Sequence, residues 1–184
     1  MGRIKSAWEI ALEKTQDIEI DEARYRTDKL EREGMALAGG YLNNTDQKLD
    51  VLAAKYASYS DDDLAIVRRG MVSTILSNIS LPNDDIYQMR FDRTTDLVSI
   101  VTHGNVQALG LMQQISDFLK QYTDAKTAFV DRMKAQIQQA MESNPEGVNS
   151  AQYSQLITQN LKKMDAQYGE ALENTKQSLK QILG

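Results

Sequence analysis

The chain of 184 residues has no cysteine, only two prolines and only one histidine. The missing cysteine excludes disulfides, thiolate catalysis and zinc–sulfur sites. A single histidine excludes the di-iron bundle pattern, which needs two Glu-x-x-His motifs, and leaves no convincing serine triad. Pro82 and Pro145 both stand where helical apolar patterns stop, as expected if helices fill most of the chain.

Long apolar runs and blocks of one charge are also missing. Residues 97–116 carry no formal charge, but too many polar side chains for a membrane span. The residues before Glu9 contain no apolar core of signal-peptide length. The 21 basic and 26 acidic side chains are spread evenly and give a net charge of −5, so no segment offers a basic footprint for nucleic acid. We therefore expect a soluble, cytoplasmic protein with no nucleic-acid partner and no integral membrane segment.

Two long amphipathic patterns fill residues 105–184. Apolar residues recur at helical spacing over about 106–143 and again over about 151–183, with a break at residues 144–147, Asn-Pro-Glu-Gly. The second stripe has a mean period near 3.6, which is typical of a straight bundle helix rather than a supercoil. This pattern predicts a long antiparallel helical hairpin.

Five shorter helical patterns precede the hairpin. They occupy approximately residues 4–15, 20–45, 46–58, 61–79 and 84–102. Ser60 with three following aspartates, and Asn83 with Asp84 and Asp85, are typical helix starts, while residues 103–105 (His-Gly-Asn) indicate a helix end and a new cap. The fold class is therefore all-α, about seven helices, a helical bundle ending in the hairpin. Residues 1–20 form a short amphipathic leading helix and linker, and residues 21–184 a single helical-bundle domain.

Four windows without charge locate the expected core. A stretch that avoids charge for 12 to 20 residues in a chain this charged is expected to be buried on all sides. These windows are residues 34–45, 70–83, 97–116 and 147–161.

No residue constellation indicates catalysis, a metal or a cofactor. The lone His103 at a helix end favours a turn residue over a base or ligand. The aspartate runs at 61–63 and 84–85 lack the ligand spacing of a calcium loop and favour helix capping. Asp92 and Asp96 lie one turn apart, but neighbouring arginines favour a solvated or salt-bridged face over an acid–base pair.

Glycines and the leading helix are the remaining candidates. Gly34, Gly39 and Gly40 do not have phosphate-loop spacing, so we predict close helix packing or a kink around them. The leading helix presents an apolar face that could bind its own bundle, a sister subunit or a partner groove, while its acidic residues disfavour a membrane surface. That face consists of Ile4, Trp8 and Leu12.

The sequence thus favours a non-enzymatic structural or protein-interaction protein that acts through amphipathic helices and self-associates or binds another helical protein. The alternative is a helical-bundle binding module with an apolar cavity for a lipid-like or small-molecule ligand. A third hypothesis is an enzyme whose acid–base pair comes from carboxylates and tyrosines alone.

Overall fold

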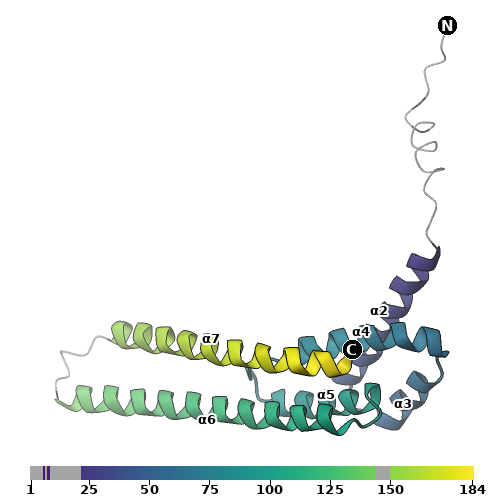
Figure 1. Ribbon diagram of the computed structural model, residues 1–184. Coiled ribbons are helices and arrows are strands. Elements are labelled where there is room, and N and C mark those ends of the chain that lie inside the picture. The colour runs from purple at the N-terminus through teal and green to yellow at the C-terminus, as the bar shows by residue number, and fades with distance from the viewer. Residues whose placement is uncertain (1–5, 7, 9–21, 144–149) are drawn as a thin grey trace.

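The computed structural model describes residues 6, 8, 22–143 and 150–184, and within these ranges it contains helices and no strands (Figure 1). The prediction of an all-helical bundle that ends in a long antiparallel hairpin is confirmed. Of the seven helices predicted, the leading one falls almost wholly outside the described residues, as does the break at 144–147. The other six are present: α2 (Glu22–Asn43), α3 (Leu49–Ala57), α4 (Asp61–Asn78), α5 (Tyr87–Val101), α6 (Val106–Ser143) and α7 (Ser150–Leu183).

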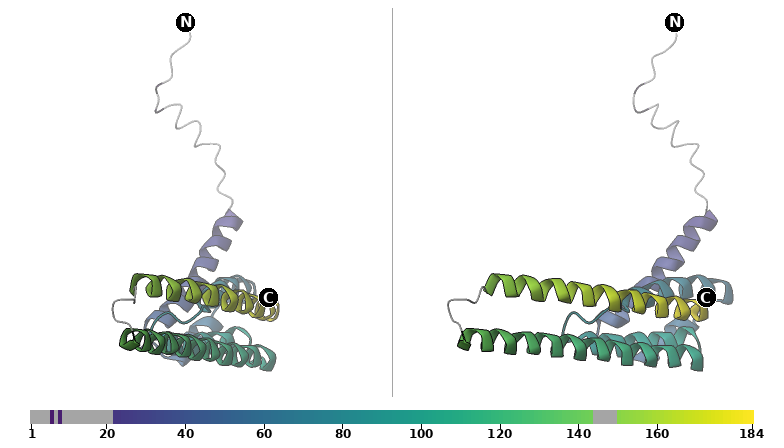
Figure 2. Two further views of the ribbon diagram at one scale, coloured as in Figure 1. Left: turned by 90° about the vertical axis from the view of Figure 1, so that its left-hand side faces the viewer. Right: turned by 60° about the vertical axis from the view of Figure 1, so that its left-hand side comes forward.

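The helices form a compact body from which two structures project. In the body, α4 contacts α2, α5 and α7, and α5 contacts α6, so that the α4–α5 pair lies against the base of the α6–α7 hairpin (Figure 2). The far part of the hairpin extends beyond the body on one side. The first turns of α2 project in another direction, and residues 22–26 are exposed.

The core lies where these helices meet. Its fully buried side chains include Leu52, Val67, Met71, Ile75, Leu97, Ile115, Leu119 and Leu179. They come from the inward stripes that the helical spacing marks in α3 to α7, because an amphipathic helix is stable in water only when its apolar face is covered. Three of the four uncharged windows contribute to this core. The prediction for residues 147–161 is wrong where the structure describes it, because residues 151–161 are exposed or half-buried.

The backbones of α2 and α4 touch where two glycines face the opposite helix. A Cβ at Gly34 would lie 2.0 Å from the carbonyl oxygen of Val67, and one at Gly70 would lie 2.0 Å from that of Glu31. No side chain larger than hydrogen fits either position. Gly39 has no atom within 4 Å of such a Cβ, and Gly40 only the end of the Gln47 side chain at 3.7 Å. Close packing therefore occurs at Gly34 but not at the other two predicted positions.

Helix ends agree with the sequence patterns in part. His103 and Gly104 have positive φ angles of 51° and 74° after α5, and the Asn105 side chain accepts from the amides of Gln107 and Ala108 at the start of α6. Ser60 stands at the N-cap of α4, but its side chain makes no capping hydrogen bond.

The predicted start of α5 at residues 83–85 is wrong. The helix begins at Tyr87 and has no acidic residue in its first turn. The carboxylate of Asp84 is used instead by the Arg90 guanidinium, which donates to it from within the helix. Because Asp84 is engaged by Arg90, its carboxylate does not cap the free backbone amides at the start of the helix.

Candidate interaction surface

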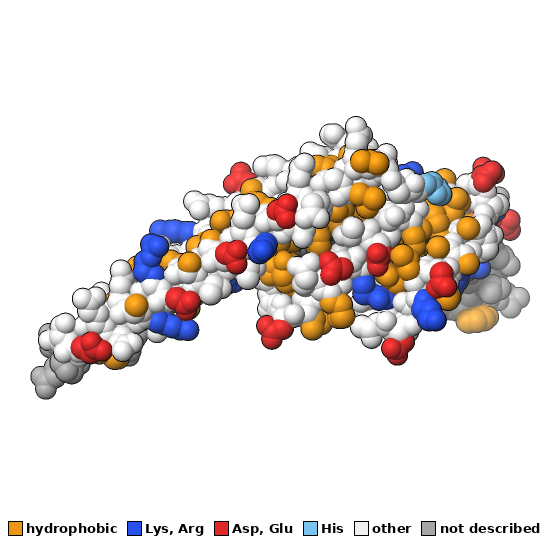
Figure 3. All heavy atoms as spheres, turned by 90° about the horizontal axis from the view of Figure 1, so that it is seen from below, with side chains coloured by type: hydrophobic (Ala, Val, Ile, Leu, Met, Phe, Trp, Pro, Cys, Tyr) orange, Lys and Arg blue, Asp and Glu red, His pale blue; other side chains and the backbone are white. Residues whose placement is uncertain are grey.

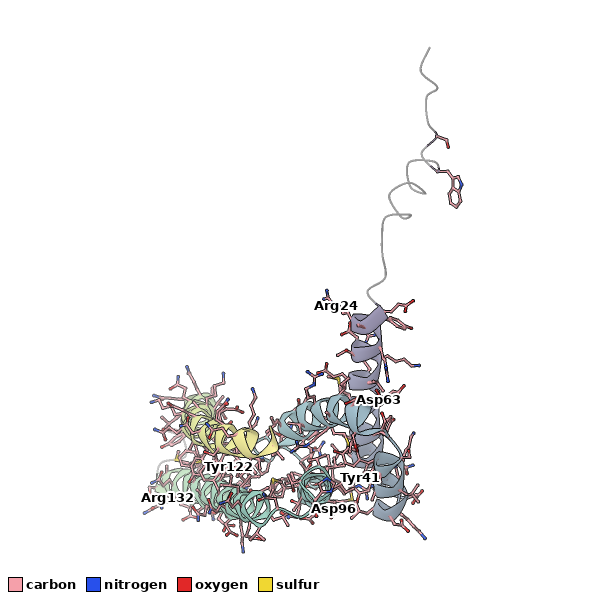
Figure 4. The ribbon with its side chains drawn as sticks, turned by 45° about the vertical axis from the view of Figure 1, so that its right-hand side comes forward. Arg24, Tyr41, Asp63, Asp96, Tyr122 and Arg132 are labelled. Atoms are coloured by element: carbon pink, nitrogen blue, oxygen red, sulfur yellow. The ribbon has the colours of Figure 1, made fainter. Side chains whose placement is uncertain are left out.

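An aromatic and polar cluster joins the two helices of the hairpin, α6 and α7, near the middle of their length. The Tyr122 hydroxyl of α6 donates to the Asp165 carboxylate of α7 over 2.7 Å and accepts from Lys126 over 2.9 Å. The Tyr168 ring packs between Phe118 and Tyr122, with centroid distances of 5.3 and 5.2 Å. Tyr122 is buried, and this burial raises the pKa of its hydroxyl. The cluster joins α6 to α7 near the middle of the hairpin, and its Tyr122 is labelled in Figure 4.

Beyond this cluster lies the part of the hairpin that we call the arm, residues 126–143 and 150–165. Its apolar stripe is a continuation of the buried stripe of α6. Because 18 residues complete five helical turns, Val130, Met133 and Ile137 lie on the same face as Met112, Ile115 and Leu119.

Burial falls sharply along this shared face. Met112, Ile115 and Leu119 are 1%, 0% and 0% exposed in the body. In the arm only Met133 is buried, at 7%, while Val130 and Ile137 are half-buried. The same type of side chain at the same helical position is thus fully buried near the body and, except for Met133, only half-buried beyond it. We call this incompletely buried side of the arm its uncovered face.

The second helix of the arm shows the same change. Leu172 and Leu179 are 2% and 0% exposed where α7 packs in the body. Ile157 and Leu161 are half-buried in the arm, and Leu156 is 46% exposed, as is Met141 near the end of α6. Seen from below, apolar side chains continue along the arm among scattered charges (Figure 3). The arm is therefore an amphipathic two-helix layer. It lacks the second helical layer that α4 and α5 provide at the base of the hairpin.

A second polar cluster joins α2 to α5, and sequence reasoning did not foresee it. The Arg93 guanidinium donates to the carbonyl oxygens of Tyr41, Asn44 and Gln47 over 2.6 to 3.1 Å and lies 3.7 Å above the Tyr41 ring. The carbonyl of Tyr41 lies in the last turn of α2, where helix carbonyls lack an intrahelical partner and a cation is favourable. The only sequence signal was an arginine among aspartates, which favoured a salt bridge instead.

Tyr41 itself donates from its hydroxyl to Asp96 over 2.7 Å (Figure 4). Burial, together with this hydrogen bond, raises the pKa of Tyr41 to about 12. Asp92 is exposed and accepts from Gln88, so the structure does not bring Asp92 and Asp96 together as an acid–base pair. A third tyrosine–carboxylate hydrogen bond attaches the α3–α4 connection to α2: the Tyr59 hydroxyl donates to Glu33 over 3.1 Å. These tyrosine–carboxylate pairs join helices.

The predicted leading-helix face is described at one residue only. Trp8 is 74% exposed, while Ile4 and Leu12 lie outside the described residues. Within the described ranges, no group of three or more histidines and carboxylates is placed to hold a metal ion. Over the same ranges no helix combines the length and apolar character that crossing a membrane requires.

The described surface also has shallow grooves. One, of about 470 Å³, lies between α4 and the end of α7 and is lined by both polar and apolar groups, among them Arg69, Val72, Glu173 and Lys180. It opens to solvent. Its mixed lining differs from the apolar interior that a lipid-like ligand requires.

These features define a class: an all-α bundle whose helical hairpin extends beyond the core with an uncovered apolar face. The chain belongs to a family of unknown function (DUF6657), whose model matches residues 53–181. The matched region runs from within α3 to near the end of α7 and so includes the whole arm, while α2 lies outside it. No curated protein and no solved structure matches the chain.

Proposed function

We propose that this protein is a non-enzymatic structural or interaction protein that self-associates through its amphipathic helices. One observation carries the proposal: the apolar face that α6 presents to the body continues along the arm, where α7 is its only cover and Val130 and Ile137 stay half-buried. Leaving such side chains in water forgoes about 25 cal/mol for each Å² of apolar surface that could be buried. Contiguous apolar patches of this kind mark interaction sites on proteins.

Light scattering coupled to gel filtration tests this proposal on the full chain. We expect a mass of two or more times 20.7 kDa, with dissociation on dilution within the range of about 1 to 100 μM. A mass of one chain throughout this range would contradict self-association. The cytoplasmic location that the composition favours belongs to the proposal and is tested by fractionation of cells that express the tagged chain.

The alternative is a binding module for a lipid-like or small-molecule ligand. Charged and hydroxyl groups share the lining of the α4–α7 groove with apolar ones, and a more apolar groove of about 420 Å³ beside Tyr25 and Ala36 of α2 also opens to solvent rather than enclosing a ligand. The uncovered arm is the more extensive feature, and we therefore favour self-association. Native mass spectrometry separates the two proposals, because a ligand module retains a co-purified small molecule of constant mass.

A further inference from the structure

The way in which the body covers the base of the hairpin indicates what kind of structure would cover the arm. At the base of the hairpin, α4 packs against α7 and α5 against α6, so two helices cover the two helices of the hairpin. The α4–α5 connection lies at the end of the body from which the arm extends, and beyond it this face of the hairpin has no second layer (Figure 1). Another layer of two helices would therefore fit against this face of the arm. The arm of a second copy of the chain is such a layer.

We propose that the uncovered face of each arm is covered by the arm of a second copy of this chain, packed antiparallel to form a four-helix bundle. This inference rests on the proposed self-association and gives it a surface and a geometry. The antiparallel orientation follows from the body, since parallel arms joined through this face would place both bodies in the same space. Antiparallel arms place the bodies at opposite ends.

The size of the face is sufficient for a dimer. The 18 residues of α6 in the arm span about 27 Å at 1.5 Å per residue. Two helices packed 8–10 Å apart make a face about 20 Å wide. Two such faces in contact bury about 1,000 Å², which is near the lower bound for a specific interface. Ile86 and Met89, at the start of α5, are 54% and 40% exposed, and the antiparallel arrangement brings the tip of the other arm to this end of the body.

The charges of the arm favour the same orientation. Glu142 lies near the tip, whereas Lys126, Lys162, Lys163 and Asp165 lie toward the base, which therefore keeps a net positive charge. Lys162 and Lys163 are exposed on α7. In an antiparallel pair the acidic tip of one arm lies beside the basic base of the other. Parallel arms would place base beside base and tip beside tip, which is unfavourable across an interface, whereas the antiparallel pair places like charges of α6 together at its midpoint, where Lys134 faces its own copy.

A matched pair of double variants tests the surface. Val130→Lys with Ile137→Lys places two charges on the uncovered face. Ala128→Lys with Ala135→Lys makes the same charge change, at the same spacing, on exposed positions about 200° round the helix. We expect the first variant to weaken dimerisation at least about 100-fold in sedimentation velocity and the control less than about 3-fold. Circular dichroism verifies that both variants keep their helix content.

Single cysteines in this cysteine-free chain test the orientation. Lys134 lies near the midpoint of the α6 part of the arm, between Val130 and Ile137, and in an antiparallel pair it faces its own copy. Lys134→Cys alone should form a disulfide-linked dimer on mild oxidation. Thr127→Cys and Met141→Cys should each remain unlinked alone but should link to each other when mixed, because they are equally distant from that midpoint.

The outcomes separate this inference from the proposed function. A wild-type monomer at every concentration contradicts both. A wild-type dimer that resists the Val130 and Ile137 substitutions keeps self-association and overturns the arm as its surface. A dimer that the substitutions dissociate, but in which the mixed Thr127 and Met141 cysteines fail to link, overturns the antiparallel geometry.

Discussion

Alanine at the helix crossing of Gly34 and Gly70 is the most direct test of how this body is packed. Both glycines touch the opposite backbone: a new Cβ at either would lie 2.0 Å from a carbonyl oxygen. Carbon and oxygen atoms that are not bonded stay more than 3 Å apart, so α2 and α4 would have to separate by about 1 Å or more. Backbone atoms cannot rotate away as a side-chain end could, and the well-packed core on both sides resists the shift.

The expected magnitude is the difference of two opposing effects. Replacing glycine by alanine inside a helix stabilises it by about 0.5–1 kcal/mol when the methyl group has space. Overpacking costs about 1–3 kcal/mol. Gly34→Ala is therefore expected to lower the free energy of unfolding, whereas Gly39→Ala, five residues on in the same helix with no atom within 4 Å, is expected to raise it. The gain in helix propensity is common to both variants, so their stabilities should differ by the overpacking cost alone, about 1–3 kcal/mol.

Urea denaturation followed by circular dichroism measures this difference. The midpoint should fall for Gly34→Ala and Gly70→Ala and rise for Gly39→Ala, with Gly110→Ala in α6 as a second open control. In thermal unfolding, the difference corresponds to about 2–12 °C for a chain of this size. Equal stabilities of Gly34→Ala and Gly39→Ala would refute the close approach of α2 and α4 as described.

Three further predictions concern the polar contacts. Arg93→Ala should lower the free energy of unfolding by about 2–3 kcal/mol because it leaves carbonyls at the end of α2 without a cation, whereas the exposed Arg69→Ala should change it by less than about 0.5 kcal/mol in the same urea titration. Asn105→Ala should cost about 1 kcal/mol through the loss of two capping bonds in α6, and an unchanged midpoint would contradict this. Tyr41 holds its proton more tightly when folded, with a pKa of about 12 against an ordinary 10.0, so its contribution is complete below pH 10, and stability should fall as the pH rises from 10 to 12. Tyr41→Phe should make that fall shallower, and an identical pH profile for both proteins would exclude Tyr41 as a cause.

Helical spacing was sufficient to predict much of the fold. The stripes that place Met112, Ile115 and Leu119 on one face, and the His-Gly-Asn sequence at residues 103–105, are local signals that act within a few turns. The start of α5 was predicted wrongly because Asp84 has two possible partners, the backbone amides ahead of it or Arg90, and only the structure shows which is used.

Contacts between segments far apart in the chain could not be predicted in this way. Gly34 and Gly39 look equivalent in the sequence, yet one touches Val67 and the other faces open space. Arg93 looked like a partner for a neighbouring aspartate, but the end of α2 lies within its reach. Each depends on which helix crosses which, and that is a property of the assembled body.

By itself, the sequence determined that the chain forms amphipathic helices, that the last two are long and antiparallel, and that disulfides and metal–thiolate sites are excluded. These follow from periodicity and composition, which are local and additive. Only the tertiary structure decided where the covering layers end. The stripe of α6 keeps its spacing from Met112 to Ile137, but α4 and α5 are too short to follow it, so its first half is fully buried while Val130 and Ile137 in its second half stay half-buried.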